Sequence, residues 1–164
     1  MTSIIKTIII AFSLFIIDAF MLNQGGIALF ILIIVLPLMV ARTIKKRKDR
    51  VELKKRLIVM GIYAAMIIFV FVSNYLNNVI AKSRSEEIIK ACERYRIRNG
   101  AYPPELSSLM PNFLKEIPTA KYTFSSNQFR YIVSADRHSL MFVSIPPFGR
   151  SYYIFEEKKW SSID

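Results

Sequence analysis

The stretch that decides the fold is Leu57–Asn99, with the sequence LIVMGIYAAMIIFVFVSNYLNNVIAKSRSEEIIKACERYRIRN. Its 43 residues contain no proline and one glycine, Gly61, so no strong helix breaker interrupts them. As one α-helix the stretch would extend over about 65 Å. The hydrocarbon core of a bilayer is only about 30 Å thick. The stretch therefore predicts a helix that crosses a membrane and continues into a folded domain.

The two parts of this stretch differ in character. Residues 57–80 carry no charge over 24 positions, which meets the length of a spanning helix, about 17–25 apolar residues. Residues 82–99 are amphipathic, with a less polar face that recurs at spacings of three and four. Asn99-Gly100 is a typical helix stop. The amphipathic face comprises Ser85, Ile88, Cys92, Tyr95 and Asn99.

Two further apolar stretches, residues 4–22 and 25–41, precede the third span. Backbone groups in lipid must bond internally, so we expect residues 1–41 to form a two-span helical hairpin. Asp18 is the only ionisable residue deep in a span, which makes it a functional candidate. Its place near the end of the span also allows a structural role at the 23–26 turn. A secretory signal peptide is the competing interpretation, but Asp18-Ala19-Phe20 is a poor cleavage site.

The formal net charge of +11 is concentrated in residues 42–56, which carry nine Lys or Arg residues against Asp49 and Glu52. Positive loops stay in the cytoplasm. We therefore expect a cytoplasmic N-terminus and loop, with residues after 81 on the extracytoplasmic side of a bacterial inner membrane. The loop is also a candidate for lipid contact, and it lacks the interleaved aromatic residues of a nucleic-acid site. Its basic residues are Arg42, Lys45, Lys46, Arg47, Lys48, Arg50, Lys54, Lys55 and Arg56.

The chain beyond Gly100 predicts a short helical turn through Leu106 and Leu109, followed by strands. Alternating apolar and polar residues indicate strands near 129–133 and 140–144, and a third over 152–155. Turns at 135–138 and 146–149 would connect them as an antiparallel meander. The expected fold class is therefore a three-span helical anchor plus a small α+β domain, residues 82–164. In that domain the long helix packs on three or four antiparallel strands.

A series of short motifs follows this order along the chain. They are Ala-Cys-Glu-Arg-Tyr at 91–95, Asn-Gly-Ala-Tyr-Pro at 99–103, Leu106, Leu109-Met110-Pro111, Phe113-Leu114 and Ile117-Pro118. With them, residues 57–160 resemble the type IV pilins and the type II secretion pseudopilins. The resemblance implies a helix that is half embedded in the membrane and half packed on an antiparallel sheet. It also implies a non-enzymatic part in a pilus or secretion assembly.

The chain departs from that family at the processing site. Family members carry a glycine followed by Phe or Met, and a Glu at the fifth position. Here Ile62 follows Gly61 and Met66 occupies the fifth position, and two spans precede the segment. Normal processing and polymerisation into a fibre are therefore not expected. The acidic residues toward the C-terminus do not form a dense oxygen-ligand loop, so no calcium site is expected either.

Catalytic chemistry has little support in the sequence. His138 is the only histidine and falls in a predicted turn, where a solvated role is expected. Cys92 is the only cysteine, so no intramolecular disulfide can form, and its helix face predicts a core position. We expect no catalytic residue, no metal, no cofactor, no small-molecule substrate and no nucleic acid.

The expected partners are membrane lipid and another protein. Aromatic residues near the C-terminus are candidates for the protein contact, because such residues suit interfaces. An alternative function is an immunity protein against a toxin that acts at the periplasmic side of the membrane. A small-solute transporter or channel would need more polar residues in the spans than Asp18, Asn74, Asn77 and Asn78. The candidate contact residues are Phe148, Tyr152, Tyr153, Phe155 and Trp160.

Overall fold

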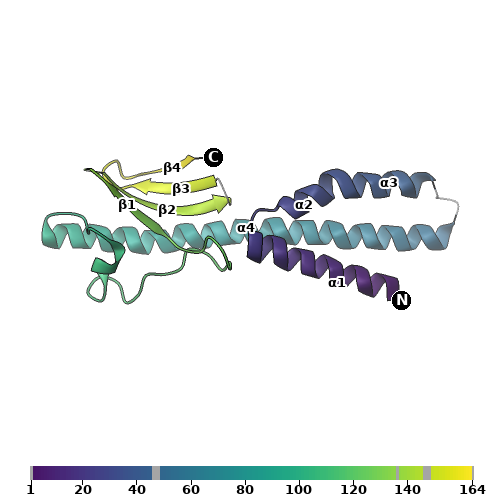
Figure 1. Cartoon of the computed structure of the whole chain (residues 1–164), viewed down its shortest axis with the longest axis horizontal. Coiled ribbons are helices and arrows are strands. Elements are labelled where there is room, and N and C mark those ends of the chain that lie inside the picture. The colour runs from purple at the N-terminus through teal and green to yellow at the C-terminus, as the bar shows by residue number, and fades with distance from the viewer. Residues whose placement is uncertain (1, 46–48, 136, 146–148, 164) are drawn as a thin grey trace. The chain divides into compact units, whose positions relative to one another are not determined.

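The computed structural model describes residues 2–45, 49–135, 137–145 and 149–163 (Figure 1). Its contacts form two compact units, Met1–Tyr75 and Leu76–Asp164, and helix α4 contributes to both. The helical elements are α1 (Thr2–Ile16), the π-helix η1 (Ile17–Leu22), α2 (Gly26–Phe30), the π-helix η2 (Ile31–Val35), α3 (Leu36–Lys45), α4 (Arg50–Asn99) and the 3-10 helix η3 (Leu106–Leu109). The strands are β1 (Arg130–Ser134), β2 (Arg137–Ile145), β3 (Gly149–Ile154) and β4 (Lys159–Ile163).

The first unit contains the predicted apolar helices. Ser3–Leu22, Gly26–Lys45 and Arg50–Asn99 are each long and apolar enough to cross a membrane, with mean hydropathies of 2.2, 2.6 and 2.3 in their most apolar windows. Ala11 and Ala28 are buried at their contacts, and such small residues let helices approach closely. Large apolar side chains such as Phe12 and Ile33, 63% and 66% exposed, point away from this small core. That distribution suits a helical unit surrounded by lipid.

The boundary of the basic segment differs from the prediction. Residues 42–56 were expected to form a loop, yet Arg42 to Lys45 end α3 and Arg50 already begins α4. Oδ1 of Asp49 accepts the backbone N–H groups of Val51 and Glu52, at 2.9 and 3.1 Å, which caps the helix. Lys, Arg and Glu favour helix, so the charged segment lengthens α4 upstream of Leu57. Lys46, Arg47 and Lys48 lie outside the described residues.

The second unit begins within α4, and the helix ends where the sequence predicts. The backbone N–H of Gly100 donates to the carbonyl of Arg96 at 2.8 Å, and Gly100 has a φ of +84°. Such a left-handed residue after the last turn is the usual helix C-cap, and glycine adopts it without strain. In Figure 1 much of the chain between η3 and β1 runs below α4, whereas the strands lie above it. Arg94 anchors this segment by donating from Nη2 to the carbonyl of Phe113 at 2.9 Å.

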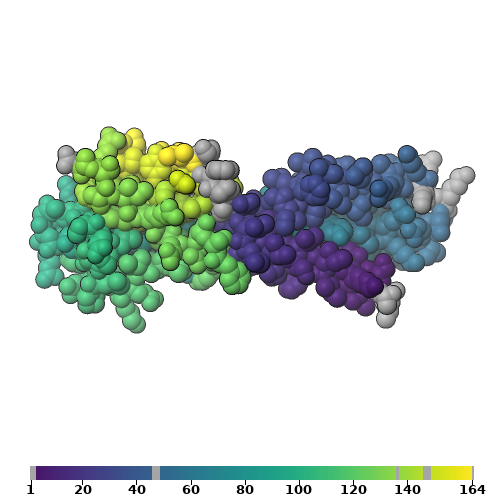
Figure 2. Space-filling model, viewed as in Figure 1, coloured from purple at the N-terminus to yellow at the C-terminus, as the bar shows by residue number. Residues whose placement is uncertain are grey.

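The predicted meander is confirmed, with a fourth strand. The sheet has the order β1-β2-β3-β4, and every neighbouring pair is antiparallel. Short connections such as that between Ser134 and Arg137 make consecutive strands neighbours. Together with the outer part of α4 this sheet forms an α+β domain, and Figure 2 shows its strands (light green to yellow) gathered on one side of that domain.

The core of this domain lies between α4 and the sheet. Ser85, Ile88 and Cys92 are fully buried, as their spacing predicts, whereas Asn99 of the same predicted face is exposed. The buried face instead begins one turn earlier, at Ala81. Small side chains on the helix allow large ones on the sheet to fill the space. The sheet contributes Phe129, Leu140, Phe142 and Phe155.

Replacement of the most enclosed aromatic residue tests this core. Phe155 is fully buried, and its ring centroid lies 5.0 Å from that of Tyr102 and 5.3 Å from that of Tyr153. Phe155→Ala is expected to destabilise the domain by about 3–5 kcal/mol, because it removes packing and leaves a cavity. Urea unfolding of the full chain in detergent, followed by Trp160 fluorescence, measures the loss. Ile97→Ala, at a side chain 84% exposed, is the control and should change stability by less than about 0.5 kcal/mol.

Candidate functional site

The strand register separates the sheet into two faces. Leu140 pairs with Tyr131 on one side and with Tyr153 on the other, and all three pack in the core with α4. Successive residues of a strand point to opposite faces. Met141 and Tyr152, one position along from Leu140 and Tyr153, therefore belong to the face directed away from α4.

This outer face of the sheet is largely apolar and is bordered by cations. Ile132 and Ile163 are 44% and 57% exposed, while Met141 at the centre is nearly buried. An exposed apolar patch rimmed by charge is typical of a protein-binding surface. The apolar members are Ile132, Met141, Val143, Tyr152, Ile154 and Ile163. The basic members are Arg130, Arg150 and Lys159.

The predicted aromatic surface is therefore mostly wrong. Phe155 is fully buried, and Tyr153 and Trp160 pack against the core next to it. Tyr152 alone belongs to the outer face, and Phe148 lies outside the described residues. The alternation along this strand indicates which residues face outward. Tyr152 and Ile154 point to the outer face, whereas Tyr153 and Phe155 point to the core. The same rule applied to β1 and β2 would have found Ile132 and Val143.

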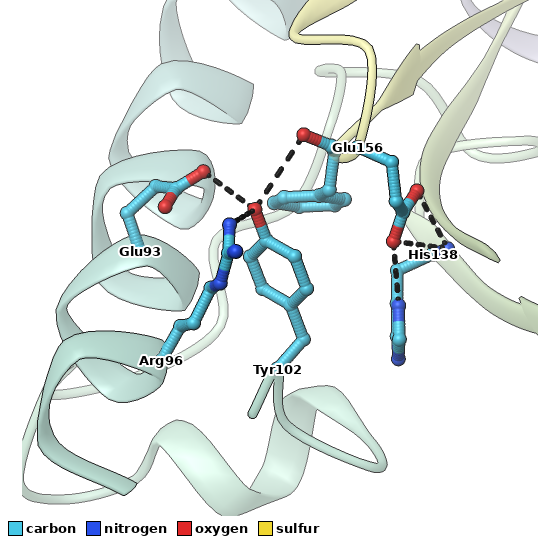
Figure 3. A network of polar contacts seen from close by, with 6 residues as sticks. Glu93, Arg96, Tyr102, His138 and Glu156 are labelled. Carbon is cyan, nitrogen blue, oxygen red and sulfur yellow. Dashed lines mark hydrogen bonds and ion pairs between the residues drawn. The ribbon is translucent and has the colours of Figure 1, made fainter. Parts of the chain in front are cut away.

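A polar network joins the end of α4 to the sheet (Figure 3). The Tyr102 hydroxyl donates to Oε1 of Glu93 at 2.8 Å and accepts from Nη1 of Arg96 at 2.9 Å. Burial, with the help of the Glu93 hydrogen bond, raises the pKa of Tyr102 to about 12. A phenol with that pKa stays protonated and keeps donating. The network therefore ties the turn after Gly100 to the helix and provides no activated nucleophile.

His138 lies in strand β2 and not in the predicted turn. Its backbone N–H and ring Nδ1 contact Glu156, with Nδ1 2.8 Å from Oε1, and the imidazole is 18% exposed. Its ring also packs on Tyr102, with centroids 5.2 Å apart. Burial alone would raise the pKa of Glu156, but the hydrogen bonds from His138 outweigh it and the pKa is lowered. The expected solvated role is therefore wrong, and the pair fastens the two strand ends.

Asp18 has a structural partner in the helical hairpin. The carboxylate is fully buried, and its Oδ2 accepts the backbone N–H of Ala28 at 2.7 Å. This N–H lies in the first turn of α2, where helix amides lack internal acceptors. Close by in the turn, Gly25 has a φ of +72°, and a Cβ there would lie 3.3 Å from the Phe71 ring. Asp18 thus caps the second apolar helix, which favours the structural interpretation of this acid.

Part of the predicted basic set lines a cleft in the first unit. The cleft has a volume of about 560 Å³ and collects Arg42, Lys55 and Arg56 from two helices. Arg56 is partly neutralised, because its Nε lies 3.0 Å from Oε1 of Glu52. Arg50, Lys45 and Lys54 lie on the helix ends outside the cleft lining. The remaining cations suit a phosphate oxygen of a lipid headgroup, and lipid contact stays a prediction.

The thiol of Cys92 is held in an unreactive state. Burial, and to a lesser extent the charge of Glu93, raises the pKa of the Cys92 thiol to about 12. The nucleophilic thiolate is therefore scarce at neutral pH. Within the described residues no three His, Cys, Asp or Glu side chains gather at one point.

Removal of the Asp18 cap should loosen the start of α2. Asp18→Ala leaves the Ala28 amide without its acceptor, at a cost of about 1.4 kcal/mol, which corresponds to about tenfold faster amide exchange. Hydrogen–deuterium exchange of the peptide spanning 26–30, in nanodiscs, measures the rate. Asp18→Asn is the control, because its side-chain oxygen can still accept. Equal exchange in the two variants would show that Asp18 does not act as a cap.

The Glu156–His138 pair should give a pH-dependent stability. The lowered pKa of Glu156 means that its stabilisation is present above the ordinary Glu pKa and is lost as the pH falls through the folded-state pKa. Wild type should therefore be more stable than Glu156→Gln at neutral pH, with the gap closing as the pH falls below about 4. Urea midpoints across that range measure it. In a His138→Phe background the gap should be smaller but not absent, because the backbone N–H of residue 138 can still donate to Glu156.

The outer face of the sheet, the Asp18 cap and the basic cleft are each formed by residues of a single chain. Comparison with the models of known protein families, with curated proteins and with solved structures finds no match to this chain. Within the described residues the geometry presents the apolar outer face of the sheet, a cationic cleft and a capped hairpin between two apolar helices.

Proposed function

We propose that this protein is a non-enzymatic bacterial inner-membrane protein that displays a pilin-like domain outward for protein–protein interaction. Its role would be that of an accessory component in a pilus or secretion assembly. The N-terminus and the basic segment lie in the cytoplasm, and the sheet domain lies on the periplasmic side. The partner is a pilin or a secretion component.

One observation carries the proposal. Helix α4 runs without interruption from Arg50 to Asn99, so an apolar span and a domain-building helix are the same element. Its outer part buries Ile88 and Cys92 under a four-stranded antiparallel sheet. This division of one helix between membrane and sheet is the arrangement implied by the motifs of residues 91–118. The uncovered outer face of the sheet supplies the surface for a partner.

The experiment has two steps, of which the first determines orientation. Single cysteines replace Val51 and Ile97, which are 66% and 84% exposed on α4. The buried Cys92 thiol, with its pKa near 12, reacts slowly and leaves a low background. A membrane-impermeant maleimide applied to intact cells should label Ile97→Cys and should label Val51→Cys only after the membrane is permeabilised. The reverse pattern would contradict the proposed orientation.

The second step identifies the partner. A photoreactive benzoyl-phenylalanine at Tyr152 reports on the outer face of the sheet, and the same group at Ile97 is the exposed control. In cells that assemble pili or secrete protein, Tyr152 should give an adduct with a pilin or secretion component, and Ile97 should not. Adducts at Tyr152 with an incoming toxin would instead support the immunity function. Equal labelling at both positions would mean that the outer face has no specific partner.

A further inference from the structure

The loop of residues 119–128 exposes two aromatic side chains that alternate with buried neighbours. Tyr122 and Phe124 are 61% and 80% exposed. The side chains that alternate with them are hidden, since Lys121 is 1% and Thr123 is 7% exposed. Full exposure of two aromatic rings to water costs free energy, whereas the interface of a membrane favours aromatic side chains.

Several hydrogen bonds hold this loop in one conformation. The N–H of Ala120 donates to the carbonyl of Asn127 at 2.6 Å, and Nδ2 of Asn127 donates to the carbonyl of Thr123 at 3.0 Å. The buried Nζ of Lys121 donates to the carbonyl of Ser144 in β2 at 2.9 Å. The loop is thus closed on itself and tied to the sheet. The loop therefore holds its two aromatic side chains in a fixed position. Because little conformational freedom is left to lose, the entropy cost of binding through them is low.

Contacts with α4 place the loop at a defined height on that helix. Oδ1 of Asn77 accepts the N–H of Tyr122 at 3.1 Å. Arg84 donates to the Thr119 carbonyl at 2.8 Å and to the Tyr122 hydroxyl, and its guanidinium lies 4.3 Å from the centre of the Tyr122 ring. Asn77 belongs to the last turn of the apolar stretch, which ends before Lys82. The loop therefore lies beside the point where α4 changes from apolar to charged.

The length of α4 that the loop contacts is comparable to the thickness of a headgroup layer. Seven residues separate Asn77 from Arg84, about 10 Å of helix rise. The polar layer on each side of a bilayer is about 5–8 Å thick. If residues 57–80 cross the hydrocarbon core, the loop lies at the level of the headgroups, with aromatic rings at the depth typical of an aromatic belt.

We propose that the loop 119–128 is a membrane-interface anchor, with Phe124 and Tyr122 seated among lipid headgroups and Arg84 holding Tyr122 in place. The partner is the phospholipid surface of the membrane that α4 crosses, so the inference rests on the proposed membrane anchoring. The anchor fixes the height of the domain above the bilayer. It leaves the outer face of the sheet available to a protein partner.

Depth-dependent quenching in the full chain tests the anchor. Phe124→Cys is labelled with a nitrobenzoxadiazole fluorophore and reconstituted in vesicles of phosphatidylethanolamine and phosphatidylglycerol. Ile97→Cys, 84% exposed near the end of α4, is the matched control, and Ile68→Cys, 62% exposed in the third span, reports on membrane insertion. The slowly reacting Cys92 stays in place, and Trp160 fluorescence verifies the fold of each variant.

The anchor predicts a distinct result for each position. Nitroxide on the lipid headgroup should remove most of the fluorescence at position 124 and little at 97, whereas nitroxide deep in the acyl chain should quench 68. If 68 is quenched while 124 behaves like 97, the anchor is wrong and the membrane insertion stands. If 68 is also unquenched, the proposed membrane protein fails and the anchor with it. Fluorescence at 124 that responds to protein concentration instead of nitroxide lipid would show that a second copy covers the loop, which also overturns the anchor.

Discussion

Backbone hydrogen bonding in α4 is the constraint on which the rest of the structure depends. Within lipid there is no water to bond the amides, so an apolar segment must remain helical. Once the first turn has formed, each further turn extends the helix from the one before it. No proline follows until Pro103, and no glycine after Gly61 until Gly100. The same ladder of hydrogen bonds therefore continues from the apolar stretch into the folded domain. The inner face of the sheet packs on the helix surface that this ladder forms, at Ile88 and Cys92.

The face of α4 that packs on the sheet is narrow. Its width determines which face of the sheet is covered by the helix and which is not. Ala81, Ser85 and Ala91 contribute little volume, so the sheet can lie close to the helix and fill the space with Leu140, Phe142 and Phe155. One helix can cover only one face of four strands. The other face keeps Ile132, Tyr152 and Ile163 without a helix over them. The proposed partner surface is thus a consequence of building a sheet on a single helix.

Much of this fold could be predicted from the sequence, because the strongest signals are local. Uncharged stretches, a Gly helix stop and alternating strands depend on near neighbours, and the helices, the meander and the burial of Ile88 and Cys92 followed from them. Features that depend on distant pairing could not be predicted. His138 pairs with Val133 in the sheet and contacts Glu156, and the buried Lys121 donates to the carbonyl of Ser144. In the loop 119–128 the exposure of Tyr122 and Phe124 depends on the hydrogen bond that closes the loop and on its contact with Asn77, neither of which joins near neighbours in the sequence.

The order of the strands has a consequence for many copies of the chain in one membrane. β1 and β4 are the edge strands of the sheet. Under the proposed membrane anchoring, tethering would confine neighbouring domains to a plane, where their edges would meet at high effective concentration. Open edges invite pairing between molecules. Here each edge strand is five residues long, and Arg130 and Lys159 stand at their starts. Lys159 is ion-paired with Glu157, so the short length of both edge strands is the feature that limits edge-to-edge pairing between copies.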